Sequence, residues 1–91
     1  MPRRRRSSFV ILWRMKVQAY VFIDTVNPGP KRIVKEVRKI SGVVRADALF
    51  GVPDVVAIVE GDEVGSMDEV IDRIAELDGV QGTKSKVIRW V

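Results

Sequence analysis

The chain contains no cysteine and no histidine among its 91 residues. The lack of cysteine excludes disulfides and thiol catalysis. The lack of histidine removes the commonest metal ligand and the commonest general base. The sequence also has no phosphate-binding glycine loop, nucleophile elbow, zinc spacing or ligand-spaced group of acidic residues. These absences predict a binding protein rather than an enzyme, with no cofactor and no metal.

Long hydrophobic runs are absent as well. The apolar patch at residues 9–13 is too short for a membrane span or for the hydrophobic region of a signal peptide. We therefore expect a cytoplasmic protein with no membrane partner. A length of 91 residues indicates one small domain, and a hydrophobic share of 46% is enough for a core.

The net charge of +4 is unevenly distributed along the chain. Residues 1–14 hold five arginines (Arg3, Arg4, Arg5, Arg6 and Arg14) and no acidic residue, which leaves 11 of the 16 basic and all 12 acidic residues for 15–91. We expect residues 1–14 to be a basic extension and residues 15–91 to be the domain. The extension either contacts nucleic acid or an anionic surface, or is a solvated tail, or reflects a start codon placed too early, with Met15 as the first residue.

A repeated pattern organises the domain. The first copy consists of Ile33, Val34, Val37, Ile40, Gly42 and Val43, and the second, 37 residues later, of Val70, Ile71, Ile74, Leu77, Gly79 and Val80. Each copy is the apolar stripe of an amphipathic helix, a glycine that ends the helix and the first residue of a strand. Used twice, this unit predicts the order β-α-β-β-α-β.

The expected elements follow from local signals. We predict strands at 17–26, 43–50, 55–60 and roughly 83–91, and helices at about 31–40 and 66–78. Residues 27–30 break the first strand, and Pro30 suits a first helical turn. Residues 51–54 form a hairpin turn. Ser66 and Glu69 have the spacing of a capping box at the start of the second helix.

The expected strands are apolar on both faces. In the first strand, Tyr20 and Phe22 alternate with Val21 and Ile23, and Trp90 lies in the last strand. Two helices cover only one face of a four-stranded antiparallel sheet, so the other face needs a cover of its own. We expect a second copy there, in a symmetric dimer with Tyr20, Phe22 and Trp90 at the interface. A different protein on this face is the alternative.

The two expected helices carry opposite charge. Residues 31–40 have a net charge of +4, and residues 66–78 have a net charge of −4. These charges can attract each other within one subunit or between subunits, and strong salt would weaken such an attraction. A basic helix also suits nucleic acid, but the acidic neighbour disfavours that interpretation.

Part of the sequence resembles a known family. Residues 40–43 (ISGV), 51–55 (GVPDV), Asp62 and 77–85 (LDGVQGTKS) are similar to the effector domain of the Lrp/AsnC transcription regulators, also called the RAM domain, for regulation of amino acid metabolism. The resemblance covers about residues 16–91. It implies a ferredoxin-like α+β fold, dimers that face each other through their sheets, and rings of dimers such as octamers. It also implies a small effector, usually an amino acid, between neighbouring dimers.

The resemblance also implies site residues. The turn with Gly51 and Asp54, and the pair Thr83 and Ser85, fall where the family lines its effector pocket. A zwitterionic amino acid needs an acceptor for its ammonium group, from Asp54 or Asp62, and donors for its carboxylate, from the two hydroxyls or from backbone N–H groups near Gly51. Alternatively, Gly51 and Asp54 only make the hairpin turn and Thr83 only starts a strand.

The chain departs from the family in two ways. Pro53 stands where members often carry an aromatic residue, which changes the shape of the pocket or abolishes effector binding. The usual DNA-binding domain has no room in 91 residues, so the chain resembles the stand-alone form.

Three functions remain open. The first is a stand-alone amino-acid-binding module in the regulation of transcription. The second is an oligomeric partner of a full-length Lrp/AsnC regulator, with no effector of its own. The third is a small dimeric α+β barrel enzyme, disfavoured by the lack of histidine. An ACT-type regulatory domain shares the fold, but its glycine-rich entry to the first helix fits residues 27–30 less well.

Overall fold

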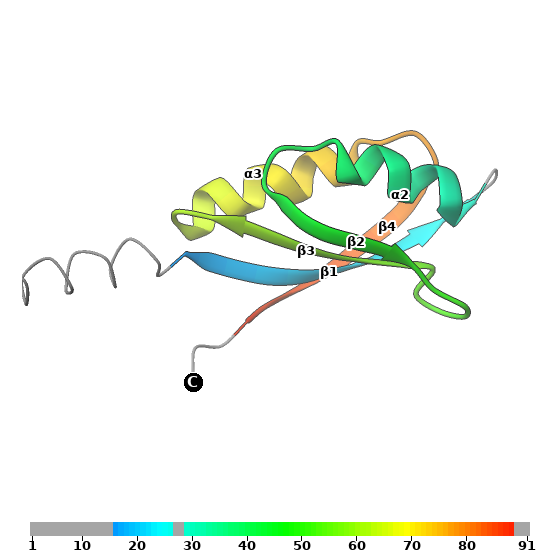
Figure 1. Ribbon diagram of the computed structural model, residues 1–91, viewed down its shortest axis with the longest axis horizontal. Coiled ribbons are helices and arrows are strands. Elements are labelled where there is room, and N and C mark those ends of the chain that lie inside the picture. Colours follow the sequence, from blue (N-terminus) through cyan, green and yellow to red (C-terminus); the bar gives the residue numbers. More distant parts are fainter. Residues whose placement is uncertain (1–15, 27–28, 89–91) are drawn as a thin grey trace, which may run out of the picture.

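Six elements follow each other in the order predicted from the repeat. The structure is a computed structural model that describes residues 16–26 and 29–88. Its elements are β1 (Val17–Thr25), α2 (Pro30–Arg38), β2 (Val43–Ala48), β3 (Val55–Gly61), α3 (Val64–Ala75) and β4 (Val80–Val87) (Figure 1). The expectations for the arginine-rich extension, for Met15 and for Trp90 lie outside the described residues. The β-α-β-β-α-β prediction is confirmed.

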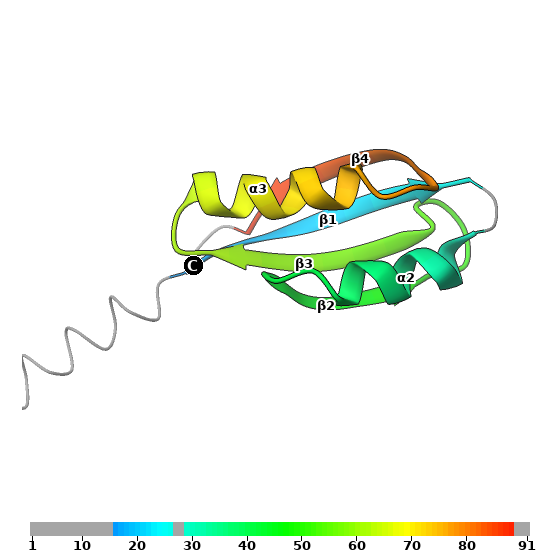
Figure 2. The same cartoon turned by 90° about the horizontal axis from the view of Figure 1, so that it is seen from above.

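The strands form one antiparallel sheet in the order β2-β3-β1-β4. Both helices lie on the same face of this sheet, as Figures 1 and 2 show from two directions. Helix α2 packs mainly on β2, and α3 packs on β3, β4 and β1. The expected ferredoxin-like α+β fold is therefore the observed one.

The core lies between the helices and the sheet. Alternate residues of β1 are fully buried there, namely Ala19, Val21 and Ile23, and they pair with Val59, Ala57 and Val55 of β3. The helices complete the core with Ile33, Val34 and Val37 from α2 and Met67, Val70 and Ile74 from α3. Since side chains alternate along a strand, a register slip of one residue would turn this whole apolar set away from the helices.

On the opposite face of the sheet the two central strands are apolar too, and charged residues of the edge strands β2 and β4 flank them. Tyr20 and Phe22 of β1 stack with their ring centroids 6.3 Å apart and pair with Ile58 and Val56 of β3. Tyr20 is 43% exposed. No helix or strand of the described residues covers these side chains. The prediction of a second apolar sheet face is borne out.

Two predicted element starts are wrong. Helix α3 begins at Val64 with Glu63 as its N-cap and has no side-chain cap, so Ser66 and Glu69 form no capping box. The backbone N–H of Met67 already donates to the Glu63 carbonyl at 3.1 Å, which places Ser66 inside the first turn. Strand β4 begins at Val80, as the repeat indicates, and not at about residue 83, as the strand pattern alone predicts; an irregular register near Thr25 lets Val80 pair there.

The repeated glycines end the two helical segments as the pattern predicts. Gly42 and Gly79 both have a φ of +99°, a left-handed conformation that favours glycine. At Gly42 a β-carbon would also lie 2.5 Å from Cγ2 of Val70 in α3. The glycine therefore lets the turn after α2 approach the second helix closely.

Replacing Gly42 with alanine tests this packing. We expect Gly42→Ala to lower the free energy of unfolding by about 2–4 kcal/mol, since the backbone is strained and the new methyl group clashes with Val70. Gly82 is the matched control because a β-carbon there meets no atom within 4 Å and its φ is not positive. Urea unfolding followed by circular dichroism measures both variants. Equal effects of the two substitutions would contradict the explanation.

Candidate functional site

Asp54 joins the β2–β3 hairpin to the neighbouring strand. It directly precedes β3, and its carbonyl oxygen accepts a hydrogen bond from the Leu49 N–H at 2.7 Å, which closes the base of the hairpin. Its Oδ2 atom accepts two more, from the backbone N–H of Thr25 at 2.9 Å and from the Thr25 hydroxyl at 3.1 Å. One carboxylate oxygen thus holds the end of β1, and no hydrogen bond to Oδ1 occurs within the described residues.

Thr83 reaches the same end of the sheet from the other side. It pairs with Ile23 of β1, whose other neighbour is Val55, the residue after Asp54. Ser85 pairs with Val21, so both hydroxyl-bearing side chains lie on the helix-covered face of β4. Thr83 is half-buried and Ser85 is exposed. The structure therefore brings Asp54 and Thr83 to the two sides of one end of β1, while Ser85 lies beside the middle of that strand.

The other two predicted residues lie apart from this group. Gly51 is at the exposed tip of the hairpin with a φ of +107°. Asp62 follows Gly61, which pairs with Val17 at the opposite end of β1. The length of β3 separates Asp62 from Asp54 by roughly 25 Å. A single chain does not place both carboxylates in one pocket.

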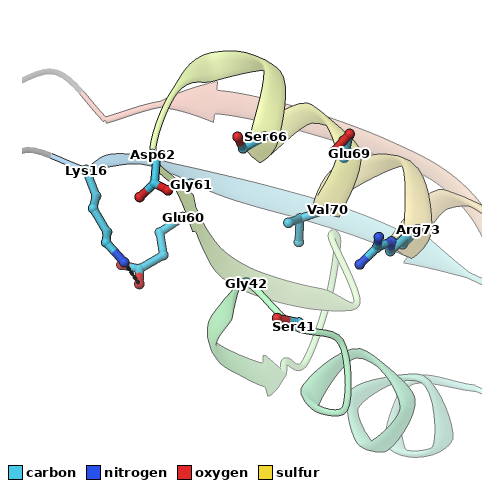
Figure 3. A pocket seen from close by; sticks show the side chains of 10 residues that line it. All are labelled: Lys16, Ser41, Gly42, Glu60, Gly61, Asp62, Ser66, Glu69, Val70 and Arg73. Atoms are coloured by element: carbon cyan, nitrogen blue, oxygen red, sulfur yellow. Dashed lines mark ion pairs between the residues drawn. The ribbon is translucent and has the colours of Figure 1, made fainter.

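Asp62 instead lines a cavity of about 360 Å³ beside the start of α3 (Figure 3). The wall combines the end of β3, the first turns of α3 and the turn that follows α2. Its lining residues are Lys16, Ser41, Gly42, Glu60, Gly61, Asp62, Ser66, Glu69, Val70 and Arg73. As a candidate site residue, sequence reasoning named only Asp62 of this set. The spacing of Ser66, Glu69, Val70 and Arg73, which places them on one side of a helix, could have indicated the rest of this wall.

The charges of this cavity have both signs. Lys16 Nζ lies 3.8 Å from Glu60 Oε2, and Gln18 Nε2 donates to Glu60 Oε1 at 3.2 Å. Within the described residues no ion pair or side-chain hydrogen bond involves Asp62, Glu69 or Arg73 (Figure 3). Two carboxylates and a guanidinium therefore remain for a ligand with both charges, but all three side chains are exposed to water.

The described residues show no sign of two other kinds of site. No group of three or more acidic residues within them is placed to hold a metal ion. None of the helices that the structure describes has the length and apolar character needed to cross a membrane.

Comparison with known proteins gives a consistent result. Residues 18–89 match the family model of the Lrp/AsnC ligand binding domain. Over 74 residues the chain is 32% identical to the HTH-type transcriptional regulator LysM of Saccharolobus solfataricus, a match that covers 80% of this chain and 52% of LysM. The chain thus spans about half the length of this relative.

Solved structures show the same fold. TTHA0845 from Thermus thermophilus superposes with a TM-score of 0.76 at 22% identity, over 82% of this chain and 95% of that one. The complex of the transcriptional regulator NMB0573 with L-Met, from Neisseria meningitidis, gives a TM-score of 0.68 at 22% identity, over 81% and 50% of the two chains.

Replacing Asp54 tests its place at the hairpin base. We expect Asp54→Ala to lower the free energy of unfolding by about 1–3 kcal/mol, because two hydrogen bonds from Thr25 lose their acceptor. Asp62→Ala is the control, since Asp62 is exposed and forms no ion pair within the described residues. Urea unfolding at neutral pH compares them. An unchanged stability of Asp54→Ala would show that the carboxylate does not hold β1.

Proposed function

This chain belongs to the Lrp/AsnC ligand binding domain family, and on that premise we propose that it binds a free amino acid as an effector in the regulation of amino acid metabolism. The observation that carries the proposal is the family match, which runs from residue 18 to residue 89 and includes every helix and strand except the first residue of β1. The family is one of regulatory ligand-binding domains, which also argues against the enzyme alternative. A related fold occurs in a regulator described as a complex with L-Met.

We place the effector at the hairpin end of the sheet. Asp54 Oδ1 is the acceptor for the ammonium group, and the hydroxyls of Thr83 and Ser85, with the backbone N–H groups near Gly51, are donors for the carboxylate. Asp54 and Thr83 flank one end of β1, Ser85 lies two residues farther along β4, and Gly51 lies at the tip of the hairpin. In this proposal they supply one half of the pocket. A neighbouring copy supplies the other half. Asp62 lies at the far end of β3 and does not take part in this site.

We further propose that two copies cover each other's open sheet face. Tyr20, Phe22, Val56 and Ile58 form a continuous apolar surface on the two central strands, and leaving it in water is unfavourable. A two-fold axis through this surface buries the same side chains from both copies. Trp90, which lies outside the described residues, is expected to join this interface.

A second candidate function has its own support. One carboxylate oxygen of Asp54 already accepts two hydrogen bonds from Thr25. Pro53 also precedes Asp54, at a position where the family often has an aromatic residue. A chain with this hairpin can serve as an oligomeric partner of a full-length Lrp/AsnC regulator without an effector of its own.

A thermal-shift screen with the common amino acids separates the two functions. We expect at least one amino acid to raise the melting temperature, by about 10–20 °C at a hundredfold excess over its dissociation constant. Thr83→Val should abolish this shift because it removes the hydroxyl, and Asp62→Asn should retain it. A shift that survives Thr83→Val and disappears in Asp62→Asn would move the site to the cavity beside α3. No shift with any amino acid would favour the partner function.

Disruption of the open sheet face tests the proposed dimer. Phe22→Lys places an unpaired charge at the centre of the contact, and we expect dimerisation to weaken by about a hundredfold or more. Val64→Lys is the matched control, because Val64 is also an exposed apolar residue (52% exposed) but lies on α3, on the other side of the sheet. Analytical ultracentrifugation measures both. Equal dimerisation of the two variants would exclude this face as the interface.

A further inference from the structure

Strand β2 forms one edge of the sheet, so its outer side pairs with no strand of the described residues. In an antiparallel pair, residues whose backbone groups bond to the partner strand alternate with residues whose groups point away from it. The Leu49 N–H donates to the Asp54 carbonyl, so these two residues are a bonded pair. The register then makes Ala48 and Ala46 residues of the other kind. Their backbone N–H and C=O groups point to the free side of β2.

The free side of β2 has room for an extended chain. Outward-pointing backbone groups on an edge strand are a template for a further strand. A hollow of about 360 Å³ lies along this part of β2, and its lining residues are Arg38, Val43, Val44, Arg45, Ala46 and Asp47. Val44 is 52% exposed and offers an apolar contact. The edge therefore has the groups that bind a strand in other proteins.

The side chain of Arg38 closes this edge. Its Nε donates to the Ala46 carbonyl oxygen at 3.0 Å, and one terminal nitrogen donates to the same oxygen at 2.7 Å. That nitrogen also lies 3.7 Å from Oδ1 of Asp47. Ala46 is buried on the helix-covered face, so Asp47, the next residue of the strand, points to the opposite face. Arg38 thus extends from α2, which lies over β2 in Figure 2, across the edge of the sheet.

Two further features limit pairing at the same edge. The Val43 N–H donates to the Ile40 carbonyl at 3.2 Å, in the turn that follows α2. The register of β2 also shifts between Val43 and Arg45, and such bulges disfavour pairing at an edge. Arg45 Nε donates to Oδ2 of Asp47 at 2.7 Å, which holds the carboxylate that Arg38 approaches. In the middle of β2, closure depends on Arg38.

The neighbouring cation of the same helix end has no such contact. Lys39 lies 3.2 Å from Glu36, within the same segment. In the described part of the chain, no ion pair joins α2 to α3, so the attraction within one subunit that the helix charges suggested is not observed there. Lys39 is therefore a matched control for Arg38, since it carries the same charge one residue later without touching the sheet.

We propose that the outer edge of β2 is a latent binding site for an extended apolar peptide, and that Arg38 keeps it closed. A strand that adds at this edge needs the Ala46 carbonyl, whose two lone pairs already accept from Arg38. Hydrogen bonds from a charged donor are stronger than those from a neutral backbone N–H. Exchanging them is therefore unfavourable. The proposal depends on neither the effector site nor the sheet-face dimer.

A synthetic peptide tests the proposal. The probe is residues 55–61 (VVAIVEG), the strand that pairs with the inner side of β2, with a fluorescent label and a lysine at each end for solubility. Arg38→Met keeps the apolar stem of the side chain and removes the guanidinium. We expect Arg38→Met to bind the probe about tenfold or more tighter than the unmodified chain in fluorescence anisotropy. Lys39→Met should bind it like the unmodified chain.

A second variant weakens the same contact without removing the guanidinium. Asp47→Asn abolishes the ion pair with Arg38, and we expect it to tighten binding of the probe by about threefold. Circular dichroism verifies the folding of each variant. If Arg38→Met does not fold, the comparison of Asp47→Asn with Lys39→Met decides between the outcomes.

Amide hydrogen exchange locates the bound probe. Addition at the edge of β2 protects the N–H groups of Ala46 and Ala48, which point outward, and leaves that of Asp47, which points to β3, unchanged. A general loss of stability would instead lower protection throughout the sheet. Equal affinity of Arg38→Met and the unmodified chain, absence of binding to both, or protection in β4 in place of Ala46 and Ala48 would each overturn the proposal.

Discussion

The alternation of side chains along β1 is the constraint on which the rest of the structure depends. Ala19, Val21 and Ile23 are fully buried beneath the two helices, so the residues between them must point to the other side of the sheet. Both of those residues, Tyr20 and Phe22, are aromatic and stack on each other. The strand that organises the core therefore also creates an apolar surface that the described helices do not cover.

The same strand sets the place of the proposed effector site. Asp54 holds the end of β1 from one side through Thr25, and Thr83 pairs with Ile23 from the other. The chain thus divides its surfaces among different tasks. In the proposal made above, the open sheet face forms the dimer and the hairpin end binds a zwitterionic ligand shared with a neighbouring copy.

The sequence predicted the fold well because each copy of the repeat specifies the buried side of a helix and the glycine that ends it. An apolar helical stripe followed by a glycine predicts that the helix ends at a residue with a left-handed backbone conformation. Gly42 and Gly79 confirm this, since both have a φ of +99°. The element starts were less predictable. The Ser66–Glu69 spacing suggested a cap, but backbone hydrogen bonding from Met67 to Glu63 begins α3 earlier. Likewise, the strand pattern alone placed the start of the last strand at about residue 83, whereas the repeat already indicated Val80, which pairs with Thr25 across an irregular register. The resemblance grouped Asp54 with Asp62 as alternative acceptors, although the predicted strand at 55–60 separates them, and they lie at opposite ends of β3.

The central claim is that a chain with one covered and one uncovered apolar sheet face does not exist in solution as a single copy. Light scattering of the unmodified protein, coupled to size-exclusion chromatography, measures this directly. The account predicts a mass of at least twice the 10.3 kDa of one chain across the micromolar range. A mass of 10.3 kDa throughout that range would contradict it, since Tyr20 and Phe22 would then remain in water.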